Sequence, residues 1–258
     1  MKIDIVDFND RISYCLVEID TVDDELKKLL QDNLIEIVTG KLEAERVSAS
    51  DDDDRKECLE EAKKYIYSKS FPNHRVGIVG ELLFHSLMRY GKMQQRFISL
   101  CPTIGYSDCY KGFYKGFDGC YYAEGRVWIA EVKSKIKSTH LDNDNEDKMK
   151  VASAQIEVEA NDTTINRWQK SKRNVYQQLN EIEKGNIEPF KLFTGKRKDE
   201  YNQMLCTLLI CNNGTFRKRH IESYIETLYH EKVKGQNIFA ICIRSFDYEK
   251  IIDFIKSL

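Results

Sequence analysis

Two neighbouring apolar runs in the middle of the chain predict a β-hairpin. The runs are Phe117–Ala123 and Arg126–Ser134, both rich in aromatic and β-branched residues, and a Glu-Gly dipeptide between them supplies the turn. When the register of a two-residue hairpin is continued along both strands, Asp118 faces Glu131. The hairpin therefore places two carboxylates opposite each other at its open end.

The second strand of this hairpin is apolar on both faces. Side chains alternate between the faces of a strand, so one face carries Val127 and Ile129 and the other carries Trp128, Ala130 and Val132. Two apolar faces indicate a strand in the interior of a sheet. Glu131 and Lys133 share the face of Val127 and Ile129.

The rest of the pattern alternates between helices and strands. Helical spacing of apolar residues predicts helices over 21–37, 55–68, 75–91, 148–183, 217–234 and 248–258. Apolar runs predict strands over 13–19, 96–101, 205–211 and 238–243, and 140–147 reads as a polar loop. This order predicts an α/β fold.

A break in the pattern at Ser70–Asn73 divides the chain into two predicted regions. Residues 1–70 form an acidic, mainly helical N-terminal region with 11 Lys and Arg against 19 Asp and Glu, a net charge of −8. Residues 71–258 hold the hairpin and carry a net charge of +6. A basic body suits contact with a polyanion, although a solvated pair of acidic helices explains the same charges.

The two facing carboxylates need a physical reason, because like charges placed opposite each other destabilise a sheet. A divalent metal supplies one, since Mg²⁺ binds to one or two carboxylates together with water and phosphate oxygens. A bound metal activates water and stabilises charge on an attacked phosphate, and a neighbouring Lys can assist. Asp118, Glu131 and Lys133 are thus the candidate catalytic residues. The alternative is an ordinary Glu-Val-Lys pattern on a solvated strand face.

These residues carry a family resemblance. Phe117-Asp118 followed by Glu131-Val132-Lys133 resembles the PD-(D/E)xK nuclease superfamily, with Phe in place of the family's Pro. The resemblance implies a restriction-endonuclease-like fold, a mixed central sheet flanked by helices, with the mainly helical N-terminal region as an extension. It also implies that Asp118 and Glu131 bind Mg²⁺ or Mn²⁺ and that Lys133 assists the attacking water.

The predicted helix over 75–91 is apolar on both sides, which indicates a buried helix. Glu81 lies on one of these dry faces, where a carboxylate needs a positive partner. In the superfamily a helix before the sheet often carries a Glu aimed at the metal, so the resemblance makes Glu81 the third candidate metal ligand. An ion pair with Arg75 or Arg89 is the alternative.

Five basic residues are candidate nucleic-acid contacts. Lys111 and Lys115 alternate with tyrosines in the loop before the site, where rings can stack on bases and ammonium groups can contact phosphate. Lys135 follows the Glu-x-Lys pattern, and Lys172 and Arg173 lie in the predicted long helix. The alternative for the Tyr-rich loop is a well-packed loop without a ligand.

The composition argues against several other classes. No apolar run approaches the ~18–20 residues of a membrane span, and the first ten residues lack a signal-peptide pattern. Eight cysteines without a Cys-x-x-Cys motif indicate reduced core thiols and a cytoplasmic location. The five histidines show no zinc-ligand spacing, and the sequence holds no Walker A signature.

The expected function is a Mg²⁺-dependent nuclease that hydrolyses phosphodiester bonds of DNA. The chain also resembles the nuclease subunit of Hachiman-type antiphage defence systems in its size, acidic helical front, Gly-Glu-Leu-Leu helix and Asp…Glu-x-Lys hairpin. This resemblance implies a helicase partner, a role in antiviral defence and activity that is restrained until infection. The alternative is a non-catalytic nucleic-acid-binding or scaffold subunit on the same fold.

Overall fold

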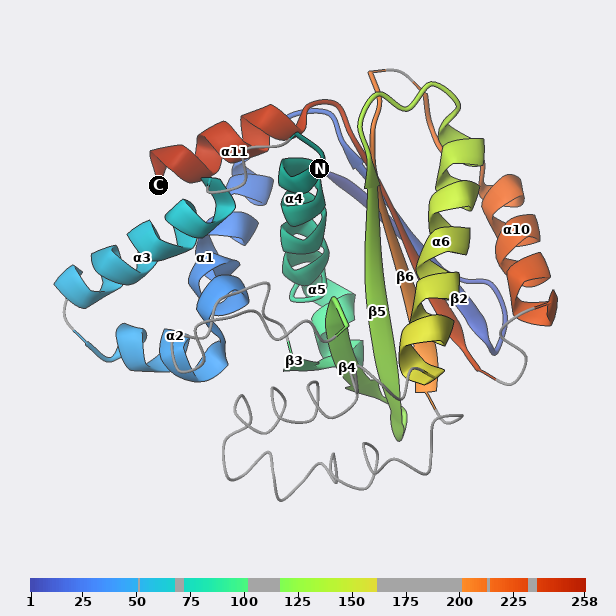
Figure 1. Cartoon of the computed structure of the whole chain (residues 1–258), viewed down its shortest axis with the longest axis horizontal. Coiled ribbons are helices and arrows are strands. Elements are labelled where there is room, and N and C mark those ends of the chain that lie inside the picture. Colours follow the sequence, from blue (N-terminus) through green and yellow to red (C-terminus); the bar gives the residue numbers. More distant parts are fainter. Residues whose placement is uncertain (51, 68–71, 102–116, 162–200, 213, 232–235) are drawn as a thin grey trace.

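A mixed β-sheet runs through the protein, which is described from a computed structural model of residues 1–258 (Figure 1). The structure describes all residues except 51, 68–71, 102–116, 162–200, 213 and 232–235. Within the described residues the sheet has seven strands in the order β1-β2-β7-β6-β5-β4-β3. Their bounds are Lys2–Asp7 (β1), Ile12–Ile19 (β2), Ile98–Cys101 (β3), Gly119–Ala123 (β4), Arg126–Lys135 (β5), Tyr201–Ile210 (β6) and Ile238–Ser245 (β7).

The centre of the sheet is parallel and its two edges are antiparallel. Strands β2, β7, β6 and β5 run parallel to one another, whereas β1 is antiparallel to β2 and the β3–β4–β5 edge is a meander. Parallel neighbours require long crossover connections, which commonly contain helices. The predicted mixed α/β architecture is therefore confirmed.

Helices cover both faces of the sheet (Figure 1). On one side α4 and α11 pack beside α1, and the shorter α2 and the longer α3 lie outside them. On the other side α6 packs on β5 and β6, and α10 lies beside it. The bounds are Asp24–Thr39 (α1), Lys41–Ser48 (α2), Asp52–Tyr67 (α3), Pro72–Leu87 (α4), Gly91–Arg96 (α5), Leu141–Asn161 (α6), Lys218–Glu231 (α10) and Tyr248–Ser257 (α11).

Strand β5 shows how the sequence pattern builds these two layers. Trp128 and Ala130 belong to the hydrophobic cluster on the α4 side, whereas Val127 and Ile129 belong to the cluster on the α6 side. All four side chains are buried. The prediction of an interior strand is confirmed, because β5 lies between β4 and β6.

Residues 1–70 contain the helices α1, α2 and α3 and also contribute two strands to the same sheet and core. The unpredicted strand β1 pairs with β2, and β2 pairs in parallel with β7 along its whole length. Helix α1 buries Leu26, Leu30 and Leu34 in the cluster that also contains α4 residues. The predicted boundary between 1–70 and 71–258 thus crosses a continuous sheet and does not separate two hydrophobic cores.

Two predicted helix boundaries also move. The polar segment predicted as a loop over 140–147 falls within α6 from Leu141 onwards, because Asp142 and Asp144 suit the first turn of a helix. The part of the predicted long helix beyond residue 161 lies outside the described residues. Helix α3 begins at Asp52, so Asp52, Asp53 and Asp54 occupy its first turn.

The described part of the chain contains no helix that is long and apolar enough to cross a membrane. Six of the eight cysteines are buried in the core, where reduced thiols are expected: Cys15, Cys58, Cys120, Cys206, Cys211 and Cys242.

Candidate functional site

The β4–β5 hairpin has the register that its two-residue turn predicts. Tyr122 pairs with Val127 and Gly119 pairs with Ala130. Strand β4 begins at Gly119, so Asp118 lies one residue before the ladder. Its carboxylate does not extend the sheet but accepts a hydrogen bond, with Oδ2 lying 2.8 Å from the backbone nitrogen of Val132. The side chain of Asp118 therefore binds to the edge of β5 just beyond the residues that pair with β4.

Glu131 and Lys133 form a buried ion pair on the α6 side of β5. The Lys133 Nζ lies 2.8 Å from Glu131 Oε2, and the Glu131 side chain has no exposed surface. Their face follows from the alternation along the strand, since Val127 and Ile129 point the same way. A carboxylate is costly to bury unless a cation and hydrogen bonds compensate. The structure thus brings together Glu131 and Lys133, and the Asp118 carboxylate accepts a hydrogen bond from the backbone nitrogen of Val132, which lies between them in the strand.

The main chain of Asp118 is held by a histidine that the sequence analysis did not select. His85 on α4 is fully buried, with Nε2 2.9 Å from the carbonyl oxygen of Asp118 and Nδ1 2.7 Å from the Tyr121 hydroxyl. Burial, together with the positive charge of Arg89, lowers the pKa of His85 to about 3. His85 is therefore neutral at physiological pH. Its position one turn after Glu81 was the available sequence signal.

Close packing of α4 on the hairpin fixes this arrangement. A Cβ atom at Gly119 would lie 3.0 Å from Tyr121 Cε2 and 3.1 Å from Phe84 Cε1. The Phe84 and Tyr121 rings meet edge to face, with centroids 5.7 Å apart. Glycine at 119 thus allows the backbone beside Asp118 to approach α4 closely.

Glu81 is partly buried on α4, one helical turn before His85, so both side chains project from the same side of the helix. The two arginines considered as its ion-pair partners bind other acids: Arg75 lies 3.6 Å from Glu249, and Arg89 lies 2.7 Å from Glu36. In the described part of the chain, no three His, Cys, Asp or Glu side chains are grouped to hold a metal ion. Glu81 as a third ligand therefore stays a prediction.

Asp118 and Glu131 fit a hard divalent cation by their chemistry. Both donate carboxylate oxygens, and Mg²⁺ needs only one or two such groups when water and phosphate complete its shell. The hairpin register brings the two residues to the same end of the β4–β5 ladder. The donor set thus matches Mg²⁺ or Mn²⁺ bound together with a substrate phosphate.

Lys135 is the candidate nucleic-acid contact that the structure describes. Its Nζ lies 2.5 Å from Asp144 Oδ1, and Ser138 donates a 2.7 Å hydrogen bond to the other oxygen. Burial acts to raise the pKa of Asp144, yet the hydrogen bonds from Lys135 and Ser138 outweigh it and hold that pKa below its usual value. Lys135 is thus bound at the start of α6. The other four candidates, Lys111, Lys115, Lys172 and Arg173, lie outside the described residues.

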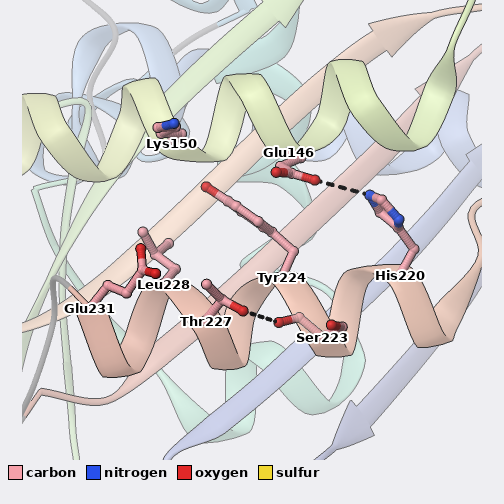
Figure 2. Close-up of a pocket in the computed structure, with 8 residues that line it drawn as sticks. All are labelled: Glu146, Lys150, His220, Ser223, Tyr224, Thr227, Leu228 and Glu231. Atoms are coloured by element: carbon pink, nitrogen blue, oxygen red, sulfur yellow. Dashed lines mark hydrogen bonds and ion pairs between the residues drawn. The ribbon is translucent and has the colours of Figure 1, made fainter.

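A separate hollow of about 250 Å³ lies between α6 and α10 (Figure 2). His220 Nε2 lies 3.2 Å from the Glu146 carboxylate across it, and Tyr224 points from α10 toward α6. Burial raises the pKa of the Tyr224 hydroxyl, and the charge of Glu146 acts in the same direction. None of the predicted catalytic residues lines this hollow.

Comparison with known proteins identifies one family. The family model described as HamA matches residues 2–257, which include both predicted regions and every candidate site residue. No curated protein matches the chain.

Proposed function

The chain belongs to the HamA family, which makes it a Hachiman-type antiphage defence protein, and on that premise we propose that it is a metal-dependent nuclease acting on DNA. The observation that carries the proposal is the buried Glu131–Lys133 pair beside Asp118 at the end of the hairpin. A carboxylate pair with an adjacent lysine can bind a metal ion and stabilise the charge that develops in phosphodiester hydrolysis. On this proposal the sheet is the core of a restriction-endonuclease-like fold.

Each residue of the site has a distinct role in the proposed reaction. Asp118 and Glu131 would hold Mg²⁺ or Mn²⁺, with Glu81 as the further candidate ligand. The bound ion supplies a nucleophilic water and stabilises the charge on the phosphate. Lys133 would orient that water or stabilise the charge that develops during attack, because its ammonium already lies at the Glu131 carboxylate.

A partner protein completes the proposal. The sequence has no Walker A signature, so unwinding of DNA would depend on a helicase subunit. Lys111, Lys115, Lys135, Lys172 and Arg173 would contact the DNA backbone. We place the system in the cytoplasm, where phage DNA is encountered.

The rival function is a non-catalytic scaffold that binds nucleic acid. It is favoured by one observation: Lys133 is engaged by a fully buried carboxylate, as in a purely structural ion pair. The two functions differ in their response to metal. A scaffold would bind nucleic acid equally well with or without Mg²⁺ and would release no cleaved product.

A cleavage assay separates the two functions. The purified protein is incubated with supercoiled plasmid, linear duplex DNA and RNA, in Mg²⁺, Mn²⁺, Ca²⁺ or chelator. We expect DNA cleavage in Mg²⁺ and Mn²⁺, little in Ca²⁺, and loss of cleavage in Glu131→Gln. Glu124→Gln, at the opposite end of the same hairpin, is the matched control and should cleave normally. Absence of cleavage under every condition would favour the scaffold, whereas cleavage that survives in Glu131→Gln would overturn the proposed role of Glu131.

A further inference from the structure

His85 connects the buried helix α4 to the candidate site through two hydrogen bonds. The ring is fully buried, and both of its nitrogens have partners from the β4 segment: the Asp118 carbonyl oxygen at 2.9 Å and the Tyr121 hydroxyl at 2.7 Å. A buried polar ring is normally satisfied in this way. What sets His85 apart is that one partner is the main chain of a candidate metal ligand.

The chemistry of the two partners assigns the protons of the ring. A carbonyl oxygen can only accept, so Nε2 must carry the hydrogen that it donates to Asp118. In a neutral ring the other nitrogen is then an acceptor, so the Tyr121 hydroxyl donates to Nδ1. Tyr121 therefore fixes the tautomer that binds Asp118.

The consequence reaches the carboxylate. Asp118 is held at its carbonyl by His85 and at its carboxylate by the Val132 N–H, 2.8 Å from Oδ2. Gly119, directly after it, is confined by Phe84 and Tyr121. The His85 hydrogen bond and the packing at Gly119 both hold the backbone against α4. The position of the Asp118 carboxylate therefore depends on this backbone contact.

From this geometry we infer that His85 is a positioning residue: its Nε2–H, oriented by Tyr121, holds the Asp118 backbone so that the carboxylate stays on the Val132 N–H. Only the importance of this positioning for catalysis rests on the proposed function. The positioning itself is a property of the metal-free protein and can be measured without substrate.

Hydrogen exchange of the Val132 amide reports the position of Asp118, because that N–H donates to Oδ2. Two substitutions form a matched pair. The side-chain nitrogen of His85→Gln lies about where Nε2 lies and can still donate to Asp118, whereas that of His85→Asn lies near Nδ1 and cannot reach it. We expect wild-type exchange at Val132 in His85→Gln and exchange faster by about tenfold or more in His85→Asn. Amides of β6 and β7 serve as the internal reference for global opening.

Tyr121→Phe keeps the test decisive if His85→Asn fails to fold. It leaves His85 in place but removes the donor to Nδ1, so Val132 should exchange faster than in the wild type. Unchanged exchange at Val132 in the folded His85→Asn or Tyr121→Phe protein, or equal exchange in His85→Gln and His85→Asn, would overturn the inference.

Cleavage kinetics then connect positioning to function. His85→Asn should lower kcat with little change in KM, and His85→Gln should recover most of the loss. If the wild type cleaves nothing while the exchange pattern holds, the proposed function fails and the positioning inference stands. If exchange at Val132 is unaffected while cleavage depends on Glu131, the positioning inference fails and the proposed function stands.

Discussion

Glu131 has no exposed surface, and Lys133 lies 2.8 Å from one of its oxygens. Removing one member of a buried ion pair leaves the other in a medium of low dielectric constant, whereas removing both is often nearly neutral. We therefore expect Lys133→Met to lower the free energy of unfolding of the metal-free protein by ~3 kcal/mol. The double variant with Glu131→Gln should recover most of that loss. Urea unfolding in chelator measures both values, and strictly additive effects would contradict a coupled pair.

His85 predicts a pH dependence of stability. Its pKa is lowered in the folded protein to about 3, whereas an unfolded histidine titrates near ~6.5. Between these two pH values the ring is protonated in the unfolded chain and neutral in the folded protein. The free energy of unfolding therefore falls as the pH drops below ~6.5 toward 3. His85→Gln removes this contribution.

Urea unfolding of the wild type and His85→Gln across pH 7.5 to 5 isolates the effect. The difference between their unfolding free energies should shift against the wild type by about 1.4 kcal/mol per pH unit below ~6.5. A difference that stays constant across this range would show that the ring takes up a proton in the folded protein as readily as in the unfolded chain.

The sequence could predict part of the site at this scale. The period of two places Glu131 and Lys133 on one face, and a two-residue turn places Asp118 beside them. It could not predict His85 and Tyr121 as partners, because helix–sheet packing joins positions 36 residues apart. Such a contact depends on how α4 lies on the hairpin, which local pattern does not determine.

Among the elements, the approach of α4 to β5 determines the geometry of the site. A Cβ atom at Gly80 would lie 2.5 Å from Ser134 Oγ and 3.3 Å from Val132 Cγ1, whereas one at Gly77 would have no neighbour within 4 Å. Gly80 thus lets the helix lie close to the strand that carries Glu131 and Lys133. Gly77 has no comparable role.

The two glycines give a matched pair of variants. Gly80→Val should destabilise the protein by ~1–3 kcal/mol, because its methyl groups would enter the space of Val132 and Leu208. Gly77→Ala should stabilise it by up to ~1 kcal/mol through helix propensity alone. Thermal or urea unfolding measures both, and shifts in the same direction would contradict the close-packing account.

At the same scale, most element types followed from periodicity, but several boundaries did not. Helix α6 begins inside a run that looked like a polar loop. There Asp142 binds Arg217 and Asp144 binds Lys135, so both acids have tertiary partners as well as favourable first-turn positions. Lys135 is near in the sequence, but Arg217 lies 75 residues beyond Asp142, so the sequence around the helix does not reveal that partner.

For the whole molecule, the sheet order shows that the first 70 residues are structural. Strand β2 covers the edge of β7, and α1 covers α4. Strand β1 was not predicted because it is a partly buried edge strand, and the parallel pairing of β2 with β7 joins segments far apart in the sequence. The acidic composition of the first 70 residues thus concealed β1 but not β2, which the apolar run over 13–19 predicts.

A truncated chain tests whether residues 1–70 and 71–258 fold as one unit. A fragment of residues 71–258 would expose the β7 edge and the apolar face of α4, so we expect it to aggregate or remain without a cooperative transition. Circular dichroism and size-exclusion chromatography would show this. A soluble fragment with a cooperative unfolding transition would establish that the first 70 residues are a separate addition.

We propose that Asp118 and Glu131 hold a catalytic divalent ion, which calorimetric titration of the metal-free protein with Mn²⁺ can detect. We expect binding to the wild type, weakened by about tenfold or more in both Asp118→Asn and Glu131→Gln, and unchanged in Glu124→Gln at the far end of the hairpin. Mn²⁺ binding that is the same in all four proteins, or absent from the wild type, would contradict it.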